Sequence, residues 1–65
     1  SADLNDRVIE NGEWVDVRDT VNKWCCGRVV DVKDKKVYVH YNGWSEKWNE
    51  WMDMSSPRIA KFGRY

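Results

Sequence analysis

The sequence predicts an all-β fold, a small antiparallel barrel of four or five short strands. Short stretches in which apolar and polar residues alternate are typical of half-buried strands. Turn-forming pairs such as Asn11-Gly12 and Asn42-Gly43 separate these stretches at close intervals. A chain of 65 residues has room for one small core, and therefore for a single domain. A closed barrel would also leave no sheet edge exposed.

The chain is expected to begin with a segment that lies outside the barrel. Residues 1–12 are weakly patterned and predict an N-terminal arm or a short helical turn, whereas residues 13–65 carry the barrel. Three apolar residues would seat this segment against the barrel, namely Leu4, Val8 and Ile9.

Two strands are predicted in the first half of the barrel. In residues 13–18, Val15 and Val17 alternate with other residues, which indicates one buried face. Residues 23–32 are the longest β-prone stretch. Gly27 lies in its middle, where glycine marks a bulge, a sharp bend or a close approach to another backbone.

The second half of the barrel is expected to hold two further strands and a closing turn. Residues 37–41 alternate and predict a strand, and residues 48–52 predict a fourth. Pro57 predicts a short helical turn in which it takes the first position, with Ile59 as the apolar residue that closes the barrel end. Residues 61–65 either add a fifth strand or trail off.

Composition and motifs indicate neither an enzyme nor a metal or cofactor site. The single histidine, His40, lies within a predicted strand, and the adjacent Cys25 and Cys26 lack both a predictable base and zinc-ligand spacing. Adjacent cysteines rarely pair, so two reduced thiols of a cytosolic or nuclear protein are expected. The scattered glycines form no phosphate-binding loop, and no apolar run is long enough to cross a membrane.

Charge gives only a weak indication of a nucleic-acid partner. The net charge is zero, with 11 basic and 11 acidic residues, whereas nucleic-acid-binding domains are usually basic. Basic residues gather locally in a predicted turn and in the tail, where a solvated surface is the simpler interpretation. These residues are Lys33, Lys35, Lys36, Arg58, Lys61 and Arg64.

The aromatic cluster around residues 41–51 is the strongest functional feature. Tyr41, Trp44 and Trp48 are spaced by three and four residues around one connection, which predicts that their rings meet at one mouth of the barrel. Trp48 and Trp51 are three apart, so on one strand they would face opposite sides. We expect Trp51 to point into the core and Trp48 toward the mouth, with Glu50 on the side of Trp48.

Rings grouped beside a carboxylate are suited to binding a methylated ammonium group. The ring faces attract a poorly hydrated cation, at roughly 0.5–2 kcal/mol for each well-placed ring. Glu50 would accept a hydrogen bond from a mono- or dimethyl ammonium, which still carries an N–H group. The alternative is that Trp44 and Trp48 are core bulk, since tryptophan buries a large area in small β domains.

The stretch YNGWSEKWNEW, residues 41–51, resembles the signature of chromo barrel domains, also called Tudor-knot domains. These occur in MYST-type histone acetyltransferases and MRG-type chromatin subunits. The resemblance extends to WCCGRV at residues 24–29 and to SPRI at residues 56–59, and covers roughly residues 13–60. Asn49 stands where the family pattern has aspartate, which removes one charge beside the motif.

The resemblance implies a strongly bent, five-stranded antiparallel barrel that reads methylated lysine through an aromatic cage. Carried over to this sequence, the cage is Tyr41, Trp44 and Trp48. A fourth wall falls to either Trp24 or Cys25, since counting back from Gly27 leaves both open.

The resulting hypothesis is a non-catalytic reader of methylated lysine, on a histone tail, in a larger nuclear, chromatin-associated protein. Its expected site is Tyr41, Trp44, Trp48, Glu50 and Trp24. Two alternatives stay open. One is an RNA- or DNA-binding barrel that uses Lys33, Lys35, Lys36, Arg58 and Lys61. The other is a protein-docking barrel with a degenerate cage.

Overall fold

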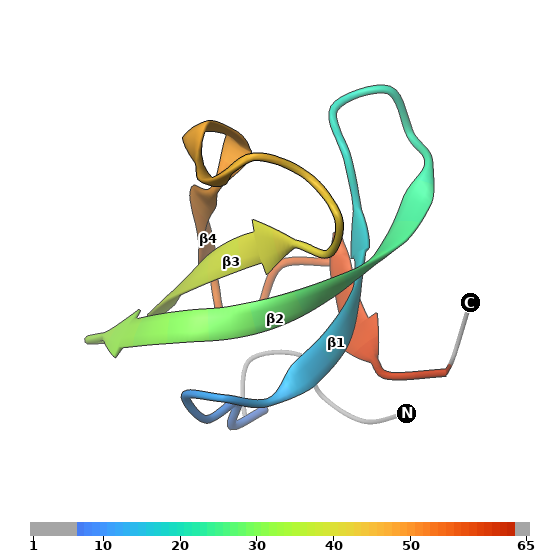
Figure 1. The fold of residues 1–65 in the computed structure, drawn as a ribbon. Helices are drawn as coiled ribbons and strands as arrows, with labels where there is room; N and C mark the ends of the chain where they lie inside the picture. Colours follow the sequence, from blue (N-terminus) through green and yellow to red (C-terminus); the bar gives the residue numbers. More distant parts are fainter. Residues whose placement is uncertain (1–6, 64–65) are drawn as a thin grey trace.

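A computed structural model describes residues 7–63 and confirms the all-β prediction (Figure 1). Five strands form one antiparallel sheet in the order β4-β3-β2-β1-β5, and the sheet curls into a half-barrel. A 3-10 helix, η2, precedes the fourth strand. The elements are β1 (Trp14–Arg18), β2 (Trp24–Lys33), β3 (Lys36–Tyr41), η2 (Glu46–Trp48), β4 (Glu50–Asp53) and β5 (Ile59–Lys61). The described residues contain no helix long and apolar enough to cross a membrane.

The core lies inside the curl of the sheet, where the alternating strands point their apolar residues. Five valines are almost completely buried, at 0–1% exposure: Val15, Val17, Val29, Val37 and Val39. Ile9, Tyr41, Met52 and Ile59 complete the buried cluster. The buried faces expected for residues 13–18 and 37–41 are therefore confirmed. Short β-branched side chains suit this position because they pack closely on a pleated surface.

Gly27 in β2 is a point of close approach between three strands. It pairs with Val15 of β1 on one side and with Tyr41 of β3 on the other. A Cβ atom at this position would lie 3.0 Å from both Val17 Cγ2 and Val39 Cγ1. Of the three expectations for this glycine, close approach is the one observed here. A register shift between β2 and β3 does occur, but between Val29 and Asp31.

The predicted fourth strand begins two residues late, and this changes the orientation of one tryptophan. Trp48 ends η2 and is not in the strand, so the odd spacing of Trp48 and Trp51 does not place them on opposite faces of a strand. Met52 is the buried residue of β4, opposite Val37. The prediction that Trp51 points into the core was wrong. Its ring is 44% exposed and packs on Tyr38, with centroids 4.9 Å apart.

The helical turn expected near Pro57 is absent from the described residues, and two hydrogen-bonded turns take its place. The Ser56 N–H donates to Asp53 O at 2.9 Å, and the Ile59 N–H donates to Ser56 O at 3.2 Å. Ile59 already belongs to β5 and pairs with Val17, so the chain has to extend there and a helical turn cannot continue. The fifth strand therefore begins at Ile59 and not in the tail, and residues 64–65 lie outside the described range.

Residues 7–12 form no helix, and the first of them lie against the β4–β5 connection. Arg7 donates from Nε to Met54 O at 2.9 Å, from Nη1 to Ile59 O at 2.6 Å and from Nη2 to Ser56 O at 2.7 Å. Ile9 is buried in the core at 5% exposure, whereas Val8 is exposed. Leu4, the third residue expected to seat this segment, lies outside the described residues.

Candidate functional site

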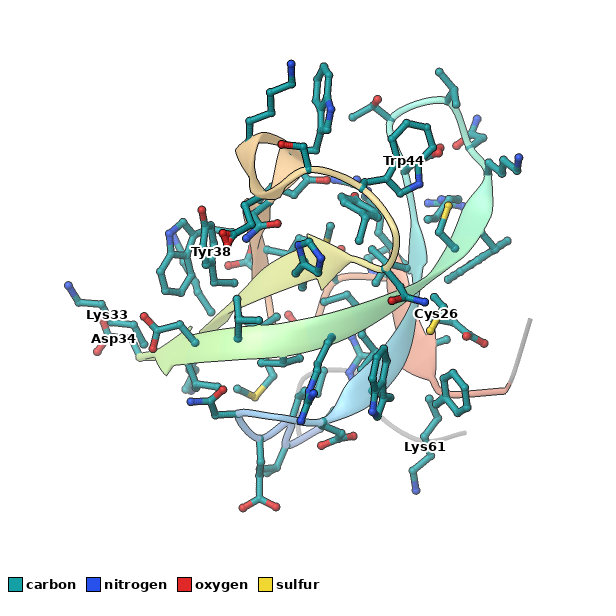
Figure 2. All side chains as sticks on the ribbon, viewed as in Figure 1. Cys26, Lys33, Asp34, Tyr38, Trp44 and Lys61 are labelled. Carbon is teal, nitrogen blue, oxygen red and sulfur yellow. The ribbon has the colours of Figure 1, made fainter. Side chains whose placement is uncertain are left out.

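A hollow of about 400 Å³ lies between the β1–β2 loop and the β3–β4 connection. The residues that give it chemical character are three aromatic side chains, two carboxylates and a thiol. They are Tyr41, Trp44, Trp48, Asp19, Glu50 and Cys25. Figure 2 shows Trp44 standing between the β3–β4 connection and the loop that joins β1 to β2. The three rings expected to meet at one mouth therefore line one hollow.

Local turns bring the rings of Trp44 and Trp48 to the end of β3. Gly43 has a φ of 85°, a left-handed conformation that glycine adopts without strain, and the Trp44 N–H then donates to Tyr41 O at 3.0 Å. Ser45 caps η2 by accepting the Lys47 N–H on its Oγ at 3.3 Å. One turn of η2 then carries the chain to Trp48.

Exposure separates these three rings into two kinds. Trp44 and Trp48 are 62% and 57% exposed, so the alternative that they are core bulk is excluded. Tyr41 is only 7% exposed and belongs both to the core and to the wall of the hollow. Lys47 also lines the hollow, with its Nζ 5.4 Å from the centroid of the Trp48 ring. The site thus has one fixed ring and two rings that remain accessible to a ligand.

The Glu50 carboxylate is already bound by two donors. The Tyr41 hydroxyl donates to Glu50 Oε1, and Arg58 Nη2 donates to the same oxygen at 2.7 Å. The second oxygen, Oε2, lies 3.5 Å from Arg58 Nη1. Burial alone would raise the Glu50 pKa, but the hydrogen bonds from Arg58 and Tyr41 outweigh it and hold the pKa below its ordinary value. Burial and the neighbouring carboxylate raise the pKa of Tyr41, which therefore keeps its proton.

Asp19 is a second carboxylate at the hollow, which the sequence analysis did not identify. Its Oδ1 accepts the N–H groups of Val21 and Lys23, both at 2.9 Å, and thereby fixes the β1–β2 loop. The Lys23 N–H is the main reason that the Asp19 pKa is lowered, so the group is ionised. Its Oδ2 faces the Cys25 thiol, at 3.8 Å. The signal in the sequence was an aspartate that opens a polar loop, a common turn feature that does not reveal what the loop faces.

Cys25, and not Trp24, is the residue of β2 that lines the hollow. Cys25 pairs with Val17 of β1, whose side chain is buried, and cross-strand partners share a face. Trp24 pairs with Arg18 on the other face, where the Arg18 guanidinium lies 5.8 Å from the ring centroid. The structure thus does not bring Trp24 to the other expected site residues. Both cysteines are free thiols, as expected.

The basic residues of the nucleic-acid alternative do not gather on one surface. Lys33 and Lys36 lie at the β2–β3 hairpin, with Lys35 in its turn, whereas Lys61 is in β5. Figure 2 shows Lys33 and Lys61 at opposite sides of the molecule. Arg58 is held by Glu50 and by Arg18 O, which accepts from its Nε at 2.9 Å.

The described residues also form no metal centre. Within residues 7–63, no group of three or more His, Cys, Asp or Glu side chains is arranged to hold a metal ion. The His40 ring forms a hydrogen bond between Nδ1 and Asn49 Oδ1 at 2.8 Å, on the outer side of β3.

Comparison with known proteins identifies one family. A model of the MBT repeat matches residues 13–63. Lethal(3)malignant brain tumor-like protein 4 from Homo sapiens is 43% identical over 35 residues, which are 54% of this chain and 6% of that much longer protein. The MBT repeat is a non-catalytic methyl-lysine reader of the same broad group as the Tudor and chromo domains. The matched family is thus a relative of the chromo barrel suggested by the motif at residues 41–51.

Proposed function

The chain belongs to the MBT repeat family, and on this premise we propose that it binds a mono- or dimethylated lysine side chain of a histone tail. The observation that carries the proposal is the hollow in which Tyr41, Trp44 and Trp48 stand opposite the Asp19 carboxylate. The rings attract the methylated ammonium, and the carboxylate adds a charge-assisted hydrogen bond.

The choice of methylation state follows from the acceptor. Asp19 Oδ2 has the Cys25 thiol as its neighbour, at 3.8 Å. Both oxygens of Glu50 instead face the Arg58 guanidinium, at 2.7 and 3.5 Å, and Oε1 also accepts from Tyr41. We therefore assign the ammonium contact to Asp19 and not to Glu50. Mono- and dimethyl ammonium groups carry an N–H for this acceptor, whereas trimethyl ammonium has none, so the lower methylation states are favoured.

The proposed setting is the nucleus, as a module of a larger chromatin-associated protein. One small hollow that engages a single side chain gives weak binding, on the order of 10 μM to 1 mM for a short peptide. Useful affinity in a chromatin protein would then come from several modules acting together.

Tryptophan fluorescence provides the test, since Trp44 and Trp48 line the hollow. The chain is titrated with histone-tail peptides carrying unmodified, mono-, di- and trimethyl-lysine. Mono- and dimethyl peptides should bind, and the unmodified peptide should not. Equal binding of all four peptides, or no binding at millimolar concentration, would refute the proposal.

Two tryptophan variants localise the binding. Trp48→Ala should abolish it with little effect on thermal stability, because the ring is 57% exposed. Trp51→Ala is the matched control, since this exposed ring packs on Tyr38 and does not line the hollow. If both variants lose binding equally, the hollow is not the site. A short RNA titrated at two salt concentrations tests the alternative, because phosphate contacts make affinity fall steeply with salt.

A further inference from the structure

A positive charge lies directly behind one wall of the proposed cation site. Arg58 Nη2 donates to the Tyr41 hydroxyl at 3.2 Å and to Glu50 Oε1 at 2.7 Å. Arg58 comes from the turn before β5 and is anchored through its Nε to Arg18 O at 2.9 Å. The guanidinium is therefore fixed one hydrogen bond away from two residues that line the hollow.

A fixed guanidinium at this position opposes the binding of another cation. Lys47 adds a second positive charge at the rim, beside Trp48. Two carboxylates face these charges, Asp19 and Glu50. With all four groups ionised their charges cancel, so loss of Glu50 alone would leave the site with a net positive charge.

We infer that Glu50 is the counter-charge of Arg58, and that the pair fixes the Tyr41 wall while keeping the hollow neutral enough to admit a methylated ammonium. This inference rests on the proposed function and adds positioning roles for two residues. Both donors occupy the Oε1 atom of Glu50, and the side chains of Arg58 and Glu50 are only 28% and 30% exposed. Their electrostatic effect is therefore less screened than that of a fully exposed ion pair.

The variant Glu50→Gln separates charge from shape. Glutamine has nearly the same size and still offers one oxygen to Tyr41 and Arg58, but it does not neutralise the guanidinium. Affinity for a dimethyl-lysine peptide should fall at least about fivefold at low salt, which is the effect of one unit charge about 4 Å away in bulk water and thus the lower limit for a partly buried charge. Thermal unfolding of the variant, followed by circular dichroism, verifies that the fold is retained.

The double variant E50Q/R58Q provides the decisive comparison. It removes both charges, so affinity should recover most of the loss seen in E50Q, although two partners of Tyr41 have now been changed. A purely structural role predicts the reverse, a double variant that binds no better than E50Q. That result, or an E50Q affinity equal to wild type, would overturn the inference. Absence of wild-type binding would instead refute the proposed function itself.

Salt dependence gives an independent measurement if the double variant fails to fold. The screening length falls from about 30 Å at about 10 mM salt to about 3 Å at about 1 M. The difference in affinity between wild type and E50Q should therefore shrink over this range. A difference that stays constant with salt would mean that Glu50 acts through shape, and would equally overturn the inference.

Discussion

The Cys25 thiol lies 3.8 Å from Asp19 Oδ2. Cys25 belongs to β2 and Asp19 to the β1–β2 loop, and both side chains line the hollow. Burial raises the Cys25 pKa, and the Asp19 charge raises it further. The thiol is therefore less reactive than an exposed cysteine, and a ligand in the hollow would cover it. Cys25 thus offers a chemical reporter of occupancy.

Alkylation of Cys25 should be slow and should become slower when a ligand is bound. In a Cys26→Ser background, iodoacetamide modification is followed by intact-protein mass spectrometry with and without a saturating dimethyl-lysine peptide. A several-fold decrease in rate is expected, since the peptide blocks access and the thiolate is already disfavoured. The reciprocal variant, Cys25→Ser, reports on Cys26, which does not line the hollow. Equal protection of both thiols would indicate a global effect and not occupancy.

Asp19→Asn should weaken binding of mono- and dimethyl-lysine peptides about tenfold, while affecting trimethyl-lysine less. The amide oxygen can still accept from Val21 and Lys23, so the loop is retained, but the charged acceptor is lost. Asp53→Asn, an exposed carboxylate in β4 outside the hollow, is the control. Isothermal titration with the three methylated peptides measures the effect. An unchanged preference among them would remove Asp19 from the ligand contact.

Binding should be independent of pH between about 5 and 8. The lowered Asp19 pKa lies below the ordinary aspartate value of about 3.9, and methylated ammonium groups stay protonated over this range. Because the pKa is depressed in the folded chain, Asp19 loses its charge only as the pH falls through that low value, and affinity should fall there. Fluorescence titrations at several pH values provide the measurement. A decrease between pH 7 and pH 5 would show that a different group controls binding.

Gly27→Ala should destabilise the domain by roughly 1–3 kcal/mol, the typical cost of overpacking a core. The new methyl group would meet Val17 and Val39 at 3.0 Å, and the carbonyl oxygen of His40 at 3.2 Å. Since the strands cannot separate without breaking their pairing, the strain has to be absorbed by both valines. Urea unfolding quantifies the loss, with Cys26→Ala as a neighbouring control. A variant as stable as wild type would mean that the sheet yields at this point.

The parts of this fold that depend on local pattern were predictable. Val37, Val39 and Tyr41 alternate within a single strand, and two-residue periodicity alone places them on one face. The same reasoning failed for Trp51, because Trp48 belongs to η2 and the alternation of the strand begins only at Glu50. η2 is capped by Ser45 at its start and by Asn49 at its end, where the backbone becomes extended again. The alternation of apolar and polar residues gives no sign of this interruption.

The site was predictable where its members are neighbours in sequence, as are Tyr41, Trp44 and Trp48. Asp19 could not be found in this way, since its place opposite the rings results from the pairing of β1 with β2 and of β2 with β3. The Glu50 carboxylate is likewise bound by Arg58, which lies in the connection between β4 and β5. Residues brought together by tertiary structure leave no spacing signal in the sequence.

The pairing of β5 with β1 also has a consequence for how the domain folds. Val17 and Ile59 are joined from nearly opposite ends of the described chain, whereas the β1–β2 and β2–β3 hairpins close short loops. Long loops carry a larger closure entropy, so we expect the β1–β5 contact to form late. Arg58 precedes Ile59 directly and would reach Tyr41 only after that strand has docked. During synthesis, the aromatic residues would therefore leave the ribosome well before the segment that locks Tyr41 in place, and binding competence would be the last property the domain acquires.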